Sequence, residues 1–102
     1  MTTDTDRVAT RIVVHGRVQG VWYRGWTVDQ ARARGLTGWV RNRRDGTVEA
    51  LLIGLNSVVR DMIDECRSGP VAARVIGIEE YAVSAEEVSG EPFHGFDQRP
   101  TE

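Results

Sequence analysis

The chain passes from a strand-like to a helix-like pattern at His15-Gly16-Arg17-Val18-Gln19-Gly20-Val21-Trp22-Tyr23-Arg24. Backbone amides of a tight glycine-containing loop can converge on an anion, and the unpaired amides at the start of the next helix add positive potential at the same point. Helical side chains lean toward the helix N-terminus, so Arg24 would fold back over the loop and meet two oxygens of a phosphate. The stretch therefore predicts a phosphate pocket where the strand gives way to the helix.

Hydrophobic periodicity on both sides of this stretch predicts the order β-α-β-β-α-β. The expected elements are strands at residues 8–15, 37–42, 47–53 and 73–83 and helices at residues 21–34 and 55–66. Gly16 and Gly20 are expected to end the first strand. Asn56 or Ser57 is the expected N-cap of the second helix, and Gly77 predicts a bulge because the apolar alternation changes phase there. Phe96 is placed in a short closing strand.

This order predicts an α+β sandwich in which two helices cover one face of an antiparallel four-stranded sheet, with the short strand at Phe96 as an optional fifth. The right-handed crossover rule makes the first and second strands parallel, with the third between them. The loop at residues 16–20 and Asn42, which ends the second strand, then share one edge of the sheet. Since neighbouring strands lie about 4.8 Å apart, Asn42 would lie about 10 Å from the loop, which leaves room for one small substrate.

The length and composition predict one domain. We expect it at residues 8–99 of the 102-residue chain, behind a flexible tail at residues 1–7. No apolar run approaches the roughly 20 residues of a membrane helix. The polar, acidic N-terminus lacks the features of a signal peptide, so we expect a cytoplasmic protein. Cys66 is the only cysteine, which excludes an internal disulfide, and its place in an apolar helical stripe predicts burial.

The charged residues narrow the function classes. All 13 basic residues are arginines, which excludes a Schiff-base lysine and a Walker-type phosphate lysine. The formal net charge of −2 argues against a broad nucleic-acid-binding surface, so phosphate recognition should be local. His15 and His94, the two histidines, make a poor metal site, and we expect neither metal nor cofactor. Asp45 and Glu49 are expected at a turn and on a strand surface, without catalytic roles.

Two segments carry a family resemblance. Gly-Arg-Val-Gln-Gly-Val-Trp-Tyr-Arg at residues 16–24 and Gly-Trp-Val-Arg-Asn-Arg-Arg-Asp-Gly-Thr-Val-Glu at residues 38–49 resemble the signature segments of the acylphosphatases. The resemblance extends from about Arg11 to Val83. It implies a ferredoxin-like fold and hydrolysis of a carboxyl-phosphate mixed anhydride to a carboxylate and inorganic phosphate. The carboxylate leaves as a stable anion, so the reaction needs no general acid.

The resemblance also implies site residues. Arg24 would be the catalytic arginine that binds the phosphate, and Asn42 would orient the attacking water. The substrate-binding residues would be Gly16, Arg17, Val18, Gln19, Gly20 and Val21, whose loop amides form the cradle. Tyr23 stands where the family usually has phenylalanine, and its hydroxyl needs a partner if it is buried in the core or at the pocket floor. The ending Phe96-Asp97-Gln98-Arg99-Pro100 departs from the usual apolar-and-arginine ending of the family.

Other functions stay open at this point. The alternative is a non-catalytic module of the same fold that binds phosphate, another anion or carbamoyl phosphate. An RNA-binding sheet would need aromatic residues on its central strands, and the two expected central strands, at residues 8–15 and 47–53, lack them. The substrate could be acetyl, carbamoyl or phosphoglyceroyl phosphate, and we expect the protein to act on it as a monomer. Trp22, Trp26 and Trp39 are expected in core or rim packing, although one of them could line the acyl side of the pocket.

Overall fold

A computed structural model describes residues 6–84, 88 and 95–102 of the chain. The elements are β1 (Arg7–Arg17), α1 (Tyr23–Ala33), β2 (Thr37–Asn42), β3 (Val48–Leu55), α2 (Asn56–Ser68), β4 (Arg74–Val83) and β5 (Phe96–Gln98). Neither the expected connection at residues 84–95 nor the expected tail lies wholly within the described residues. None of the described helices is long and apolar enough to cross a membrane.

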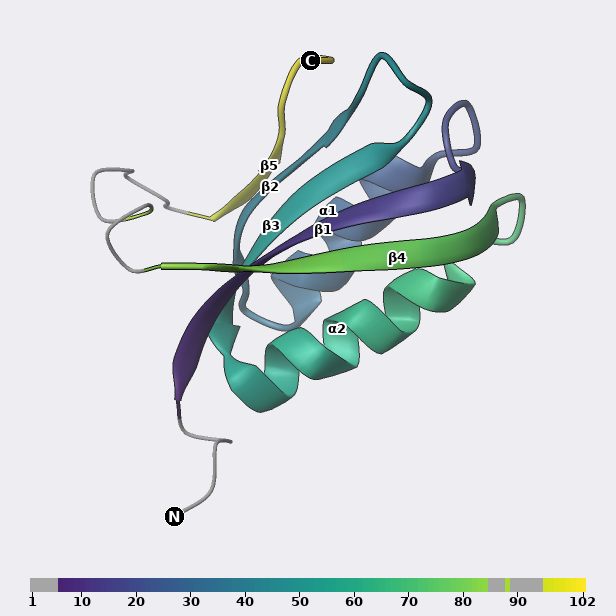
Figure 1. Ribbon diagram of the computed structural model, residues 1–102. Coiled ribbons are helices and arrows are strands. Elements are labelled where there is room, and N and C mark those ends of the chain that lie inside the picture. The colour runs from purple at the N-terminus through teal and green to yellow at the C-terminus, as the bar shows by residue number, and fades with distance from the viewer. Residues whose placement is uncertain (1–5, 85–87, 89–94) are drawn as a thin grey trace.

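The five strands form one sheet in the order β4-β1-β3-β2-β5. Both β1 and β2 pair antiparallel to β3, which lies between them, and β4 pairs antiparallel to β1. The short β5 pairs parallel to β2, so the sheet is mixed. Both helices pack on the same face (Figure 1). The predicted α+β sandwich is thus confirmed, and β1 and β2 run in the same direction, as the crossover rule requires.

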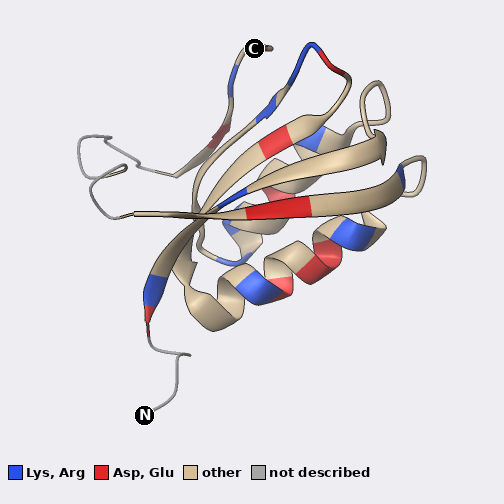
Figure 2. Ribbon diagram, viewed as in Figure 1, with Lys and Arg blue, Asp and Glu red and all other residues tan. Residues whose placement is uncertain are grey.

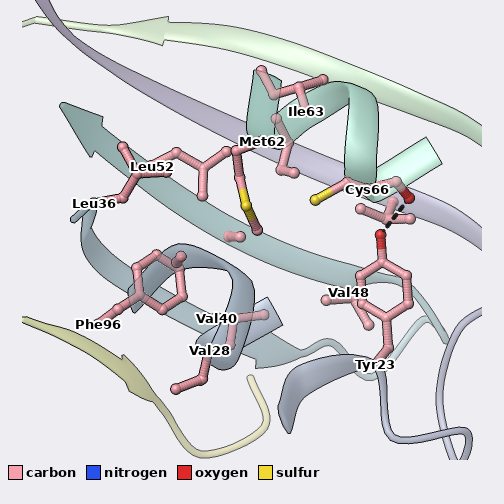
Figure 3. Packing of buried hydrophobic residues seen from close by; sticks show 14 of the residues in the cluster. Tyr23, Val28, Leu36, Val40, Val48, Leu52, Met62, Ile63, Cys66 and Phe96 are labelled. Carbon is pink, nitrogen blue, oxygen red and sulfur yellow. Dashed lines mark hydrogen bonds between the residues drawn. The ribbon is translucent and has the colours of Figure 1, made fainter. Parts of the chain in front are cut away.

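The core lies between the helices and the covered face of the sheet (Figure 3). Alternate residues of the central strands enter it, because successive strand side chains point to opposite faces. Residues of α2 enter it at helical spacing. The contributions of these three elements include Ile12, Val14, Val48, Ala50, Leu52, Val59, Met62, Ile63 and Cys66. Cys66 is fully buried, and this burial raises the pKa of its thiol to about 12, so Cys66 is a small apolar core residue, as predicted.

The Tyr23 hydroxyl lies in this core and joins the two helices. It donates a hydrogen bond of 2.6 Å to the carbonyl oxygen of Cys66 (Figure 3). Carbonyls in the last turn of a helix lack an intrahelical partner, so the hydroxyl satisfies a carbonyl near the end of α2. Burial raises the pKa of Tyr23, which keeps the hydroxyl protonated as a donor. The partner that the sequence required for a buried tyrosine is therefore present.

The first strand does not end at Gly16 as predicted, but continues beside β4 to Arg17. The register between β1 and β4 shifts between His15 and Gly16, which pair with Gly77 and Val75. The expected irregularity therefore falls at Ile76, next to Gly77. Gly16 has φ +130°, and a Cβ there would lie 2.0 Å from the carbonyl oxygen of Arg74. Glycine at this position lets β4 approach closely enough for the pairing to continue.

Both helices begin differently from the prediction. The first starts at Tyr23 instead of Val21, because Trp22 adopts a left-handed conformation with φ 67° that no helix continues. The second starts at Asn56 with Leu55 as its N-cap and without a capping side-chain hydrogen bond, so the predicted cap at Asn56 or Ser57 is wrong. The backbone amide of Asn56 instead donates to the carbonyl oxygen of Asp6. Asp6, which precedes β1, therefore supplies the hydrogen-bond acceptor that a capping side chain would otherwise supply.

Candidate active site

A small cavity of about 130 Å³ lies where the β1–α1 loop meets the end of β2. Its lining residues come from this loop, the first turn of α1, β2 and β5, and they are Val18, Gly20, Trp22, Tyr23, Arg24, Gly25, Asn42 and Gln98. Pockets for drug-sized ligands measure about 300–1,000 Å³, so this one suits a group of the size of a phosphate. The predicted meeting of the loop with Asn42 at one edge of the sheet is confirmed.

Arg24 lines this cavity, and no carboxylate of the described residues forms an ion pair with its guanidinium. It is half-buried, and no hydrogen bond or ion pair joins its guanidinium to another of the described residues. Along α2, in contrast, acidic residues lie between two arginines (Figure 2). Several arginines of the chain are paired, including Arg34 with Asp61 at 2.8 Å and Arg41 with Glu49 at 2.7 Å. A half-buried arginine that no carboxylate neutralises favours an external anion.

Asn42 lines the same cavity and carries an unpaired acceptor. Its Oδ1 atom is buried and has no hydrogen-bond partner, and within the described ranges it is the one buried side-chain nitrogen or oxygen of which this is true. Leaving a buried polar atom unpaired costs about 1–3 kcal/mol, so native proteins keep few of them. Asn42 is the last residue of β2 and lines the cavity together with Arg24. Such an acceptor is suited to holding a water molecule beside a bound anion.

Gln19 fastens the β1–α1 loop to the turn that follows Asn42. Its Nε2 donates to the carbonyl oxygens of Arg43 at 2.7 Å and Thr47 at 2.8 Å. Asp45 holds the turn itself, accepting hydrogen bonds from the amide and the hydroxyl of Thr47, and these bonds lower the pKa of Asp45. The cavity walls from β1–α1 and from β2 are therefore tied together. Sequence reasoning gave Gln19 only a backbone role and missed this contact.

The other predicted loop residues divide into two groups. Val18 and Gly20 line the cavity, and Val18 is almost fully buried. Gly16 and Arg17 instead lie in β1, paired with β4, and Val21 packs against the core. The cavity is thus lined by the middle of the predicted loop together with Arg24 and Asn42.

Four lining residues were not among the predicted site residues: Trp22, Tyr23, Gly25 and Gln98. Trp22 was one of three tryptophans left open for the acyl side, and the structure separates it from the others. Trp26 packs with Tyr23 at 5.4 Å between ring centroids. Trp39 is buried beneath guanidinium groups whose Cζ atoms lie 4.6 and 5.1 Å from its ring centroid. Gln98 gave no sequence signal, because the parallel pairing that brings β5 beside β2 depends on tertiary contacts alone.

A larger hollow of about 650 Å³ lies at the opposite end of the sheet, near the start of β1 and of α2. Its lining includes aliphatic residues of three strands, among them Val8, Ile53 and Ala82. The charged pair there, Arg60 and Glu80, is joined by its own hydrogen bond. No buried unpaired polar atom of the described part of the chain lies there. Size alone therefore does not make this hollow the reactive site.

The fold and the small cavity together define a two-layer α+β domain with a phosphate-sized cavity at one edge of its sheet. The family model for acylphosphatase matches residues 10–97. An acylphosphatase of Rhizorhabdus wittichii is 51% identical over 96 residues, covering 94% of this chain and 92% of the relative. An acylphosphatase of Nitrobacter hamburgensis is 50% identical over 97 residues, covering 94% and 98%. The chain belongs to the acylphosphatase family.

Solved structures agree with this assignment. The acylphosphatase of Bacillus subtilis superimposes with a TM-score of 0.82 at 34% identity, covering 90% of this chain and 98% of that one. A phosphate- and nucleotide-bound structure of full-length HypF superimposes with a TM-score of 0.81 at 22% identity, but this chain spans only 12% of it. The second likeness concerns the fold alone. The ferredoxin-like fold implied by the sequence resemblance is confirmed.

Proposed function

We propose that this chain hydrolyses the carboxyl-phosphate bond of small acyl phosphates, with Arg24 holding the phosphate and Asn42 orienting the attacking water. Family membership supports the reaction class. One observation carries the assignment of roles: Asn42, whose buried Oδ1 is unpaired, lines the same phosphate-sized cavity as the unneutralised Arg24. An anion and a water molecule would supply the partners that these two groups lack.

The phosphate would be held by electrostatics. Phosphoryl transfer needs positioning and stabilisation of charge on the equatorial oxygens, which backbone amides and a guanidinium can provide. Arg24 can donate to two of these oxygens at once, while amides of the β1–α1 loop face the others. Because Gln19 ties this loop to the turn after β2, the donors are fixed relative to Asn42 before substrate arrives.

Asn42 would act on the nucleophile. Its amide is no base at neutral pH, but Oδ1 can accept a hydrogen bond from water and so aim the water oxygen at phosphorus. The bond from this oxygen to phosphorus forms as the bond from phosphorus to the acyl oxygen breaks. The electron pair leaves with the carboxylate, and the water proton passes to a phosphate oxygen. The products are the carboxylate and inorganic phosphate.

We also propose that the protein acts as a monomer and that this activity takes place in the cytoplasm. Neither assignment affects the chemistry, which the lining residues would perform in any setting.

Hydrolysis of benzoyl phosphate, followed by ultraviolet absorbance, tests the proposed activity. We expect turnover that persists unchanged in excess chelator, because the proposed groups are all supplied by the chain. The non-catalytic alternative expects a different result: inorganic phosphate binds, as measured by calorimetry, but benzoyl phosphate is not consumed. A folded protein that neither binds phosphate nor consumes benzoyl phosphate would contradict both readings.

Replacing Gln19 by glutamate tests whether the tie between loop and turn serves the site. The new carboxylate would face the carbonyl oxygens of Arg43 and Thr47, so two hydrogen bonds become two repulsions. We expect kcat/KM for benzoyl phosphate to fall about tenfold or more, which corresponds to about 1.4 kcal/mol. Gln19→Ala, which removes the bonds without adding charge, should lose less. Equal activity in both variants and the wild type would show that the tie is irrelevant to the reaction.

A further inference from the structure

Trp22 occupies the wall of the cavity in an unusual way. It is the one non-glycine residue with a positive φ within the described part of the chain, at 67°. Bulky residues rarely adopt this conformation. The side chain is also 63% exposed, so burial of the indole does not explain why a tryptophan stands there. Trp26 and Trp39, in contrast, are packed against other groups.

The indole of Trp22 packs directly on the backbone at Gly25. A Cβ at residue 25 would lie 2.2 Å from Nε1 and 2.8 Å from Cδ1 of Trp22, so the ring lies directly against the helix backbone. A glycine inside a helix is unfavourable relative to alanine, as is a tryptophan in the left-handed region. Two locally unfavourable choices thus combine to hold one exposed ring beside the cavity. Departures of this kind are expected at functional positions.

The cavity is large enough for the phosphate but too small for the phosphate together with a large acyl group. At about 130 Å³, it leaves a larger acyl group to extend toward the rim, where Trp22 is exposed. Of the remaining lining residues, Arg24, Asn42 and Gln98 are polar, while Val18 and Tyr23 are almost fully buried. The indole face is the broad apolar surface available to the acyl group, and aromatic rings favour stacked or edge-to-face contact with other rings.

We propose that Trp22, packed on Gly25, forms the surface that contacts the acyl group of the substrate. This contact would favour acyl phosphates whose acyl group is a planar aromatic ring over those with a short aliphatic one. This inference rests on the proposed hydrolytic function. It makes Trp22 a specificity-determining residue that contacts the departing acyl group, whereas Arg24 and Asn42 act at the phosphate end.

The test compares kcat/KM for benzoyl phosphate and acetyl phosphate. In Trp22→Ala we expect the benzoyl-to-acetyl ratio to fall about 5- to 10-fold, the effect of losing one aromatic contact, chiefly through a higher KM for benzoyl phosphate. Trp22→Phe should keep most of the ratio. Gly25→Ala keeps the indole but displaces it from its position against the backbone of residue 25, so the ratio should fall in this variant too. Competitive inhibition by inorganic phosphate reports separately on the phosphate end and should be similar in Trp22→Ala and the wild type.

Tyr81→Ala is the matched control, because Tyr81 is an exposed aromatic residue of β4 outside the cavity lining, and its ratio should equal that of the wild type. Trp22→Gly suits the left-handed backbone and provides a second truncation should the alanine variant fold poorly. A wild type that hydrolyses both substrates while both truncations leave the ratio unmoved overturns this inference and leaves the proposed function standing. A wild type that hydrolyses neither overturns the proposed function itself.

Discussion

Replacing Arg24 by alanine is expected to lower kcat/KM for benzoyl phosphate by at least 100- to 1,000-fold, or roughly 3 to 4 kcal/mol, the usual cost of removing one well-placed electrostatic donor. The loss should be large because Arg24 is the one charged side chain among the described residues that line the cavity. The guanidinium would also act on the phosphate in both the ground state and the transition state. We therefore expect KM to rise and kcat to fall, which steady-state kinetics would separate.

Two companion variants make this result specific. Arg24→Lys should recover little activity, because an ammonium group cannot reproduce the two parallel hydrogen bonds of a guanidinium. Arg67→Ala removes an exposed arginine from α2, outside the cavity lining, and should keep near wild-type activity. Since exposed ion pairs contribute little, its stability should change little as well. Near wild-type turnover in folded Arg24→Ala would remove Arg24 from the mechanism.

The broad arrangement of the site followed from the sequence because it depends on local patterns and one topological rule. Strand and helix periodicity gave the order of elements, and the crossover rule then placed Asn42 at the same edge as the loop before Arg24. Neither step needs knowledge of side-chain packing. The structure confirms that the two residues line one cavity.

The features that the sequence did not predict all depend on tertiary contacts. Gly16 looks like a strand end, yet the close approach of β4 keeps it inside β1. Glu49 reads as a surface residue of a strand, but it is only 5% exposed, since Arg11 and Arg41 of the neighbouring strands bind its two carboxylate oxygens at 3.0 and 2.7 Å. The packing of the Trp22 indole on Gly25 likewise has no signature in the local sequence pattern. Local propensity is overridden where distant segments meet.

Replacing Asn42 by alanine is expected to reduce kcat for benzoyl phosphate about 100-fold or more while changing KM much less. The reason is that Asn42 would bind the attacking water and not the phosphate, so its loss removes an interaction that matters in the transition state. Inorganic phosphate should still bind to the variant with nearly unchanged affinity, which calorimetry would measure. A rise in KM equal to the fall in kcat/KM would instead make Asn42 a substrate-binding group.

Stability gives this prediction a second, independent readout. Because Oδ1 of Asn42 is buried without a partner in the free protein, removing it takes away an unfavourable group, although a smaller side chain also packs less well. We therefore expect Asn42→Ala to be no less stable than the wild type in urea denaturation, despite its loss of activity. Asn56→Ala, which alters the only other asparagine at the far end of the sheet, should retain activity. If Asn42 served mainly to stabilise the fold, Asn42→Ala would be less stable than the wild type. A fall in both activity and stability in this variant would therefore favour a structural role for the amide.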